Sequence, residues 1–104
     1  MIQGDIRYYT FKSPDKHRPA LILTNNDLIP VLNAITVAPI TTTLRDANTH
    51  VFLDKGDGMR EECAVNLSAI QTIPKDKIGS YITHLSEDKM QEVLETIKFV
   101  FKID

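Results

Sequence analysis

The chain has 104 residues and a mass of 11.8 kDa, which is the size of one domain and argues against two. Its 42% hydrophobic and 25% charged residues are typical of a globular protein, so they exclude intrinsic disorder and predict a packed core. The formal net charge of -2 excludes a protein that coats duplex DNA or an anionic membrane through bulk charge.

The charge pattern and the cysteine count limit the possible functional sites further. Residues 1–50 carry a slight basic excess and residues 51–104 an acidic one, so an anion site is expected in the first half. Cys63 is the single cysteine, which excludes an internal disulfide, and no Cys/His spacing suits a metal. We therefore expect no metal and no cofactor. Without a signal-peptide core or an apolar run near the ~20 residues of a membrane span, the chain is expected to be soluble and cytoplasmic.

Seven short segments have the β-branched and aromatic composition of strands. They span residues 4–11, 18–24, 33–40, 50–54, 63–67, 69–73 and 78–82. The fourth segment is followed by Lys-Gly-Asp-Gly, where Gly56 and Gly58 are expected to supply the positive φ angles of a tight turn. The chain contains no repeat, linker or low-complexity stretch, so we expect one domain over residues 1–104.

The last segment predicts an amphipathic helix over residues 87–102. Ser86 can cap the first turn, and the carboxylates that follow it favour the positive end of the helix dipole. Apolar residues then recur at three- and four-residue spacing: Met90, Val93, Leu94, Ile97 and Phe101. Several short, mostly antiparallel strands before one helix predict an α+β fold, in which a small curled antiparallel sheet or partial barrel carries the C-terminal amphipathic helix.

Familiar catalytic patterns are absent. The sequence has no P-loop, no G-x-S-x-G, no G-x-G-x-x-G and no H-E-x-x-H. Cys63 could pair with a histidine as a nucleophile, but a lone cysteine in an apolar strand is more often a small buried hydrophobe. We favour the buried role.

Two arginines stand beside polar residues at strand ends. Arg18 opens an aliphatic strand and is followed by Pro19, so its rigid fork of donors projects from a stiff backbone. The run 41–43 of three threonines ends another strand and is followed by Arg45. Together these groups indicate a metal-free oxyanion site. The alternative is a surface ion pair for Arg18 and ordinary loop composition for the threonines.

A combination of short motifs carries a resemblance to a known family. The motifs are Gly4-Asp5-Ile6, Arg18-Pro19-Ala20-Leu21-Ile22-Leu23, Val37-Ala38-Pro39-Ile40-Thr41-Thr42-Thr43, Glu62-Cys63-Ala64-Val65-Asn66-Leu67, Ile70-Gln71-Thr72-Ile73 and Thr83-His84-Leu85-Ser86. No single motif is specific, but their order and spacing over nearly the whole chain are similar to those of the MazF/PemK toxin endoribonucleases.

The resemblance implies a fold and a function. It implies an SH3-like barrel of the CcdB/PemK type, a homodimer, and metal-independent, sequence-selective cleavage of single-stranded RNA that leaves a 2′,3′-cyclic phosphate and a 5′-hydroxyl. It also implies a growth-inhibiting toxin of a type II toxin–antitoxin system, neutralised by a cognate antitoxin whose complex binds DNA. The family's key arginine corresponds to Arg18, and its key hydroxyl residue to Thr41.

Other polar residues are weaker candidates. His17 adjoins Arg18 and could shuttle a proton, provided that the strand has not begun at His17, because strand neighbours point to opposite faces. His50 and His84 are expected in surface or structural roles. Further RNA contacts are predicted at these residues: Thr42, Thr43, Arg45, Asn66 and the stacking face of Tyr9.

Two rival functions remain open. A CcdB-like protein that binds DNA gyrase would share the fold without needing Arg18 and Thr41, and a non-catalytic SH3-like module would bind RNA or a peptide without cleaving it. One feature departs from the family: the loop at residues 12–17 is shorter than the glycine-rich loop usual there, which favours an altered cut-site preference or an open groove.

Overall fold

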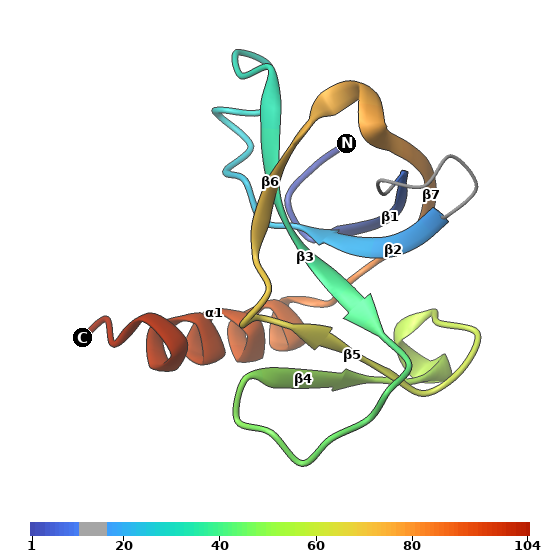
Figure 1. Cartoon of the computed structure of the whole chain (residues 1–104), viewed down its shortest axis with the longest axis vertical. Helices are drawn as coiled ribbons and strands as arrows, with labels where there is room; N and C mark the ends of the chain where they lie inside the picture. The colour runs from blue at the N-terminus through green and yellow to red at the C-terminus, as the bar shows by residue number, and fades with distance from the viewer. Residues whose placement is uncertain (11–16) are drawn as a thin grey trace.

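The computed structural model describes residues 1–10 and 17–104, which form seven strands and one α-helix. Figure 1 shows how these elements are arranged. The strands are β1 (Asp5–Thr10), β2 (His17–Ile22), β3 (Ala34–Thr41), β4 (His50–Leu53), β5 (Cys63–Asn66), β6 (Gln71–Pro74) and β7 (Ile78–His84). The helix α1 spans Glu87–Phe101, and short 3-10 turns cover Lys55–Asp57 and Lys75–Lys77. Every strand pairing is antiparallel, which confirms the predicted α+β class.

β3 is the strand that joins the two halves of the sheet. The strand order is β4-β5-β3-β2-β1-β7. Strand β6 pairs with the first half of β3, along the same edge on which β5 pairs with the end of β3. Strands β1, β2, β3, β6 and β7 curl around one side of the molecule, whereas β4 and β5 lie beside α1 (Figure 1). The end of β3 at Thr41 therefore lies where the two halves meet.

Both faces of the curled sheet bury apolar side chains. One cluster fills the barrel and includes Tyr9, Ala20, Ile22, Ile35 and Val37. The other lies between the sheet and the helix and includes Leu21, Ile40, Val51, Val65 and Val93. Because successive strand residues alternate between faces, β2 and β3 contribute to both clusters. A strand residue can therefore be assigned to one face from its place in this alternation.

The helix begins at Glu87, as its sequence predicts, and ends one residue before the predicted end. The Ser86 hydroxyl accepts a hydrogen bond from the Lys89 amide at 3.2 Å, which satisfies one of the amides left open by the first turn. Val93 is buried, and Met90 and Ile97 pack against the same cluster. Leu94 and Phe101, predicted on the same apolar stripe, are instead exposed. The helix ends at Phe101. It is too short and too polar to span a membrane, and α1 is the one α-helix among residues 1–10 and 17–104.

The segment boundaries differ from the predictions in several places. Strand β2 ends at Ile22 rather than at residue 24. A turn at residues 67–68 follows β5, and residues 69–70 belong to no strand, so that β6 begins at Gln71. Strand β7 extends to His84 because it pairs there with the start of β1. Gly58 has a φ of 95° as expected, but Gly56 does not have positive φ. Residue 11, predicted in the first strand, lies outside the described residues.

Candidate functional site

Arg18 and Tyr9 are direct partners in the antiparallel register of β1 and β2. Cross-strand partners project from the same face of a sheet, so both side chains belong to the face that lines the barrel. Tyr9 is 2% exposed, whereas Arg18 is exposed. The guanidinium of Arg18 therefore lies at the mouth of the barrel, where its charge acts on the buried phenol beside it.

Thr41 lies at the same end of the sheet as Arg18. The ladder between β2 and β3 ends at the pair Ala20–Pro39. Arg18 and Thr41 each lie two residues beyond that pair, so they are on the same face as it and as each other. The two residues for which catalytic roles were predicted thus stand at the ends of adjacent strands.

The hydroxyl of Thr41 is oriented by the turn that follows it. Its Oγ1 accepts a hydrogen bond from the amide of Thr43 at 3.1 Å. A hydroxyl that accepts one hydrogen bond can still donate its own proton. Thr41 therefore presents a positioned neutral donor next to a strand end that carries a positive charge.

A polar cavity of about 460 Å³ extends from Thr41 across β3, β5 and β4. Its volume falls in the roughly 300–1,000 Å³ range of small-ligand sites. Eight residues line it: Thr41, Thr43, Arg45, Ala47, Thr49, His50, Asn66 and Ser68. Four of the predicted site residues are brought together here, namely Thr41, Thr43, Arg45 and Asn66. The lining consists mainly of hydroxyl, amide, imidazole and guanidinium groups, which suits an anionic, hydrogen-bonding ligand.

Asn66 is held in one orientation within this cavity. Its Oδ1 accepts hydrogen bonds from the Ser68 amide at 3.0 Å and from the Ser68 hydroxyl at 2.7 Å. These two bonds occupy the carbonyl oxygen, so the side-chain NH₂ is the end that remains able to donate. Asn66 is therefore arranged as a donor to a bound ligand.

Thr42 lies apart from the other threonines. It lines an apolar cavity of about 210 Å³ whose wall also includes Tyr8, Pro19, Ile40 and Cys63. Strand β3 ends at Thr41, and Thr42 lies in the bend that follows it, where strand pairing no longer sets the direction of its side chain. Thr42 was predicted as an RNA contact, but the structure does not bring it into the polar cavity with Thr41 and Thr43.

Cys63 has the properties of a core residue. Burial, together with the nearby carboxylates of Glu61, Asp57 and Asp54, raises the pKa of its thiol to about 11. A thiol with so high a pKa stays protonated near neutral pH and is a poor nucleophile. No histidine of the described residues lines its cavity, so a Cys–His catalytic pair is not formed there.

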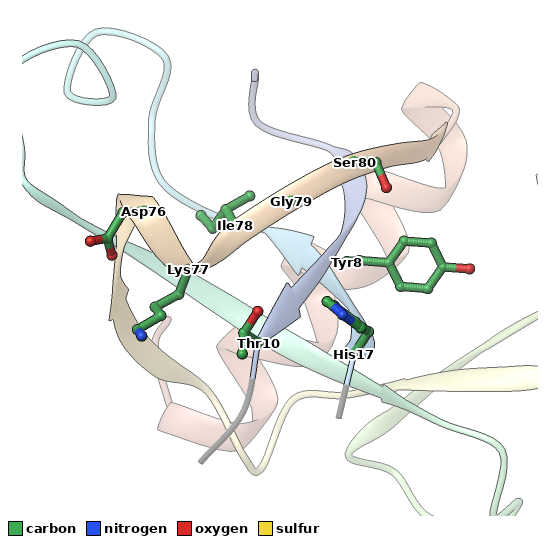
Figure 2. Close-up of a pocket in the computed structure, with 8 residues that line it drawn as sticks. All are labelled: Tyr8, Thr10, His17, Asp76, Lys77, Ile78, Gly79 and Ser80. Atoms are coloured by element: carbon green, nitrogen blue, oxygen red, sulfur yellow. The ribbon is translucent and has the colours of Figure 1, made fainter. Parts of the chain in front are cut away.

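His17 faces away from Arg18. Strand β2 begins at His17, which pairs with Thr10, so its side chain alternates with that of Arg18. His17 lines a cavity of about 360 Å³ with Tyr8, Thr10 and Lys77. Figure 2 shows the side chains that line this cavity. The condition for a shared phosphate, that the strand should start after His17, is not met.

Tyr9 belongs to the barrel core, so its ring cannot serve as the predicted stacking surface. Burial raises the pKa of its hydroxyl, and the charge of Arg18 and a hydrogen bond with Gln71 partly offset that rise. Gln71 lies opposite Val37 on β6 and reaches the same face. Sequence reasoning did not single out Gln71, because only the β3–β6 pairing brings it to Tyr9.

His50 is the other residue whose location sequence reasoning misjudged. It was expected in a surface or structural role, yet its ring lines the polar cavity opposite Asn66. No group of three or more His, Cys, Asp or Glu side chains within the described ranges is arranged to hold a metal ion.

Comparison with known proteins adds a second line of argument. A family model described as the PemK-like, MazF-like toxin of type II toxin–antitoxin systems matches residues 2–101. The chain is 39% identical over 90 residues to endoribonuclease MazF3 of Mycobacterium tuberculosis, covering 86% of this chain and 87% of that protein. It is 32% identical over 84 residues to endoribonuclease EndoA of Bacillus subtilis, covering 78% and 72% of the two chains.

Solved structures show the same similarity in three dimensions. The M. tuberculosis toxin MazF-mt6 superposes with a TM-score of 0.88 at 36% identity, covering 96% of this chain and 98% of that one. A mycobacterial endoribonuclease solved with its cognate antitoxin has a TM-score of 0.88 at 21% identity, covering 100% and 97%. At that identity the second structure supports the fold alone.

Proposed function

Since the chain belongs to the PemK-like, MazF-like family of type II toxins, we propose that it is a metal-independent, sequence-selective endoribonuclease that cleaves single-stranded RNA. The observation that carries the proposal is the placement of Arg18 and Thr41 at the ends of adjacent strands, beside a polar cavity. The products have a 2′,3′-cyclic phosphate and a 5′-hydroxyl.

The proposed reaction is attack by a ribose 2′-oxygen on the neighbouring phosphorus. The 2′-oxygen loses its proton and bonds to phosphorus, while the bond from phosphorus to the 5′-oxygen breaks and that oxygen gains a proton. Negative charge builds up on the non-bridging oxygens during this exchange. Arg18 stabilises that charge with its guanidinium, and Thr41 donates a hydrogen bond to the same phosphate.

The cavity beyond Thr41 accommodates the nucleotide next to the scissile phosphate. Thr43, Asn66 and Ser68 offer neutral donors and acceptors, which can read the edge of an unpaired base. Arg45 is exposed at the rim of the cavity and supplies charge for a phosphate. Sequence selectivity is assigned to this cavity.

We further propose that the protein acts in the cytoplasm as a homodimer and is neutralised by a cognate antitoxin that occupies the RNA groove. Exposed apolar side chains on α1 and the tail after it support protein–protein contact; they are Leu94, Phe99, Phe101 and Ile103. Two copies of Arg18 and Arg45 in one groove would concentrate positive potential in a protein whose net charge is -2.

The decisive experiment incubates purified protein with a long, lightly structured RNA in excess EDTA, followed by sequencing and chemical mapping of product ends. Arg18→Ala and Thr41→Ala should each lose about a hundred- to a thousandfold in rate, as expected when a preorganised donor is removed. Arg60→Ala and Thr96→Ala are matched controls, because one is exposed beside the apolar cavity and the other bonds within α1.

The other outcomes would support a rival function or contradict the proposed mechanism. Absence of cleavage by folded wild-type protein across diverse RNA sequences, with inhibition of DNA gyrase, would support the CcdB-like function instead. RNA binding without cleavage, weakened only slightly in Arg18→Ala, would support a binding module. Cleavage that EDTA abolishes would contradict the metal-independent mechanism.

A further inference from the structure

His50 lies on the same face of the sheet as Thr41. Thr41 pairs with Ala64, and two residues along β5 Asn66 pairs with His50, so these four side chains project from one face. Val51, which follows His50 on β4, points to the opposite face, into the core beneath α1. His50 therefore faces the cavity that begins at the candidate catalytic hydroxyl.

The ring of His50 is fixed by its surroundings. Its backbone amide donates to the carbonyl of Ala47 at 3.1 Å, which closes the turn before β4. The imidazole also packs edge-on against Phe52, with ring centroids 6.5 Å apart and planes at 75°. Because the ring lines the cavity while its Nδ1 is buried, one edge lies against the protein and the other faces the cavity.

The two ring nitrogens of His50 have different environments. Nδ1 is buried and has no hydrogen-bond partner within the described part of the chain. Nε2 makes no hydrogen bond to those residues either, but it is not among their buried, unpartnered polar atoms, so it remains accessible. The accessible nitrogen is therefore the one that can meet a ligand.

This asymmetry selects one neutral tautomer. A proton on Nδ1 would leave a buried N–H without an acceptor, and such orphaned donors are rarer than under-satisfied acceptors. A proton on Nε2 leaves only a lone pair at the buried position and directs an N–H into the cavity. The Nε2–H tautomer is favoured for the neutral ring.

We propose that His50 is a specificity-determining residue whose Nε2–H donates a hydrogen bond to the nucleobase next to the scissile phosphate. The inference rests on the proposed ribonuclease function and extends it. The side-chain NH₂ of Asn66 is directed into the same cavity, so the two donors together select a base edge with acceptor atoms. In this arrangement the charged groups of Arg18 and Arg45 bind phosphates.

The test compares three substitutions at this position. His50→Gln places an amide near the position of Nε2, His50→Asn places one near Nδ1, and His50→Ala removes both. We expect His50→Ala and His50→Asn to lose roughly five- to tenfold in kcat/KM on the preferred RNA, with weaker discrimination at one nucleotide position. His50→Gln should keep most of the rate and of the selectivity.

The readout is cleavage of a randomised RNA pool, sequenced around each cut. Unchanged rates and profiles in all three variants, with an active wild type, would overturn this inference and leave the ribonuclease function intact. Equal losses in all three variants would also overturn it, because they indicate a structural ring. An inactive wild type would instead refute the function on which the inference rests.

Two further measurements separate substrate contact from structure. Long-range ¹H–¹⁵N correlation spectra of the wild type should show the Nε2–H tautomer of His50, and the Nδ1–H tautomer would contradict the argument. Light scattering should give the same mass for wild type and His50→Ala. A change of oligomeric state would overturn the proposal by assigning His50 to a subunit contact.

Discussion

Tyr9 and Arg18 face each other across β1 and β2, one buried in the barrel and the other exposed at its mouth. The pairing links the core to the candidate site, because the Tyr9 hydroxyl also bonds with Gln71 on the far side of β3. The strand end that carries Arg18 is thereby braced from within the barrel. Substitutions of Tyr9 are therefore expected to change the position of Arg18, although Tyr9 itself does not contact RNA.

Tyr9→Phe tests this bracing. The ring and its packing are retained, but the hydrogen bond with Gln71 is lost, which should lower the free energy of unfolding by about 1 kcal/mol. Cleavage should fall several-fold while the sequence profile stays the same. Urea unfolding and cleavage assays check both effects, with Tyr81→Phe as the control because that ring is 55% exposed. A changed cut-site preference would contradict the indirect role.

Arg18→Lys tests whether a charge alone is sufficient. Lysine keeps the positive charge but lacks the planar fork that engages two oxygens at once. We expect the variant to fold normally, to bind RNA with nearly wild-type affinity and to lose at least about tenfold in kcat, because the fork matters most as charge develops on the phosphate. Single-turnover kinetics with separately measured binding check this. Wild-type kcat in Arg18→Lys would show that a point charge suffices.

Strand segments, the helix and its cap were predictable because they depend on local patterns. The capping role of Ser86 and the apolar spacing of Val93 and Ile97 need only neighbouring residues, and the structure confirms them. The adjacency of Arg18 and Thr41 was anticipated from their places at strand ends, and the resemblance of whole motifs strengthened that prediction. The residues around Arg18 do not by themselves indicate that Thr41 lies on the adjacent strand, and the residues around Thr41 do not indicate Arg18.

The residues that were misjudged depend on pairings between distant strands. Gln71 reaches Tyr9 only through the β3–β6 register, and His50 faces the cavity only because β4 pairs with β5. Tyr9 was predicted to stack on RNA because the sequence alone does not show which face of the sheet carries its side chain. Which face is buried depends on how the sheet curls, and that is a property of the whole chain.

Asp5 is expected to be the most important polar residue for stability at the junction of β1 and β7. Its carboxylate is nearly buried, accepts the Ile2 amide at 3.0 Å and lies 2.9 Å from Nδ1 of His84. Asp5→Ala should lower the free energy of unfolding by about 2 to 3 kcal/mol, since it removes charge-assisted hydrogen bonds from a buried site. Urea unfolding measures this, with Asp27→Ala as the exposed control. Equal stability of the two variants would refute this role, and cleavage by folded Asp5→Ala should match wild type.

Cys63 makes stability fall in alkaline solution. Its thiol pKa is about 11 in the folded protein against an ordinary value of 9.0, with burial as the main cause. Between these two values the unfolded thiol has released its proton while the folded one retains it, so rising pH favours unfolding. Cys63→Ala should lose less stability than wild type between pH 8 and pH 10, as measured by urea unfolding. At pH 8, iodoacetamide should modify the native thiol far more slowly than the unfolded one, and rapid native labelling would contradict the assigned burial.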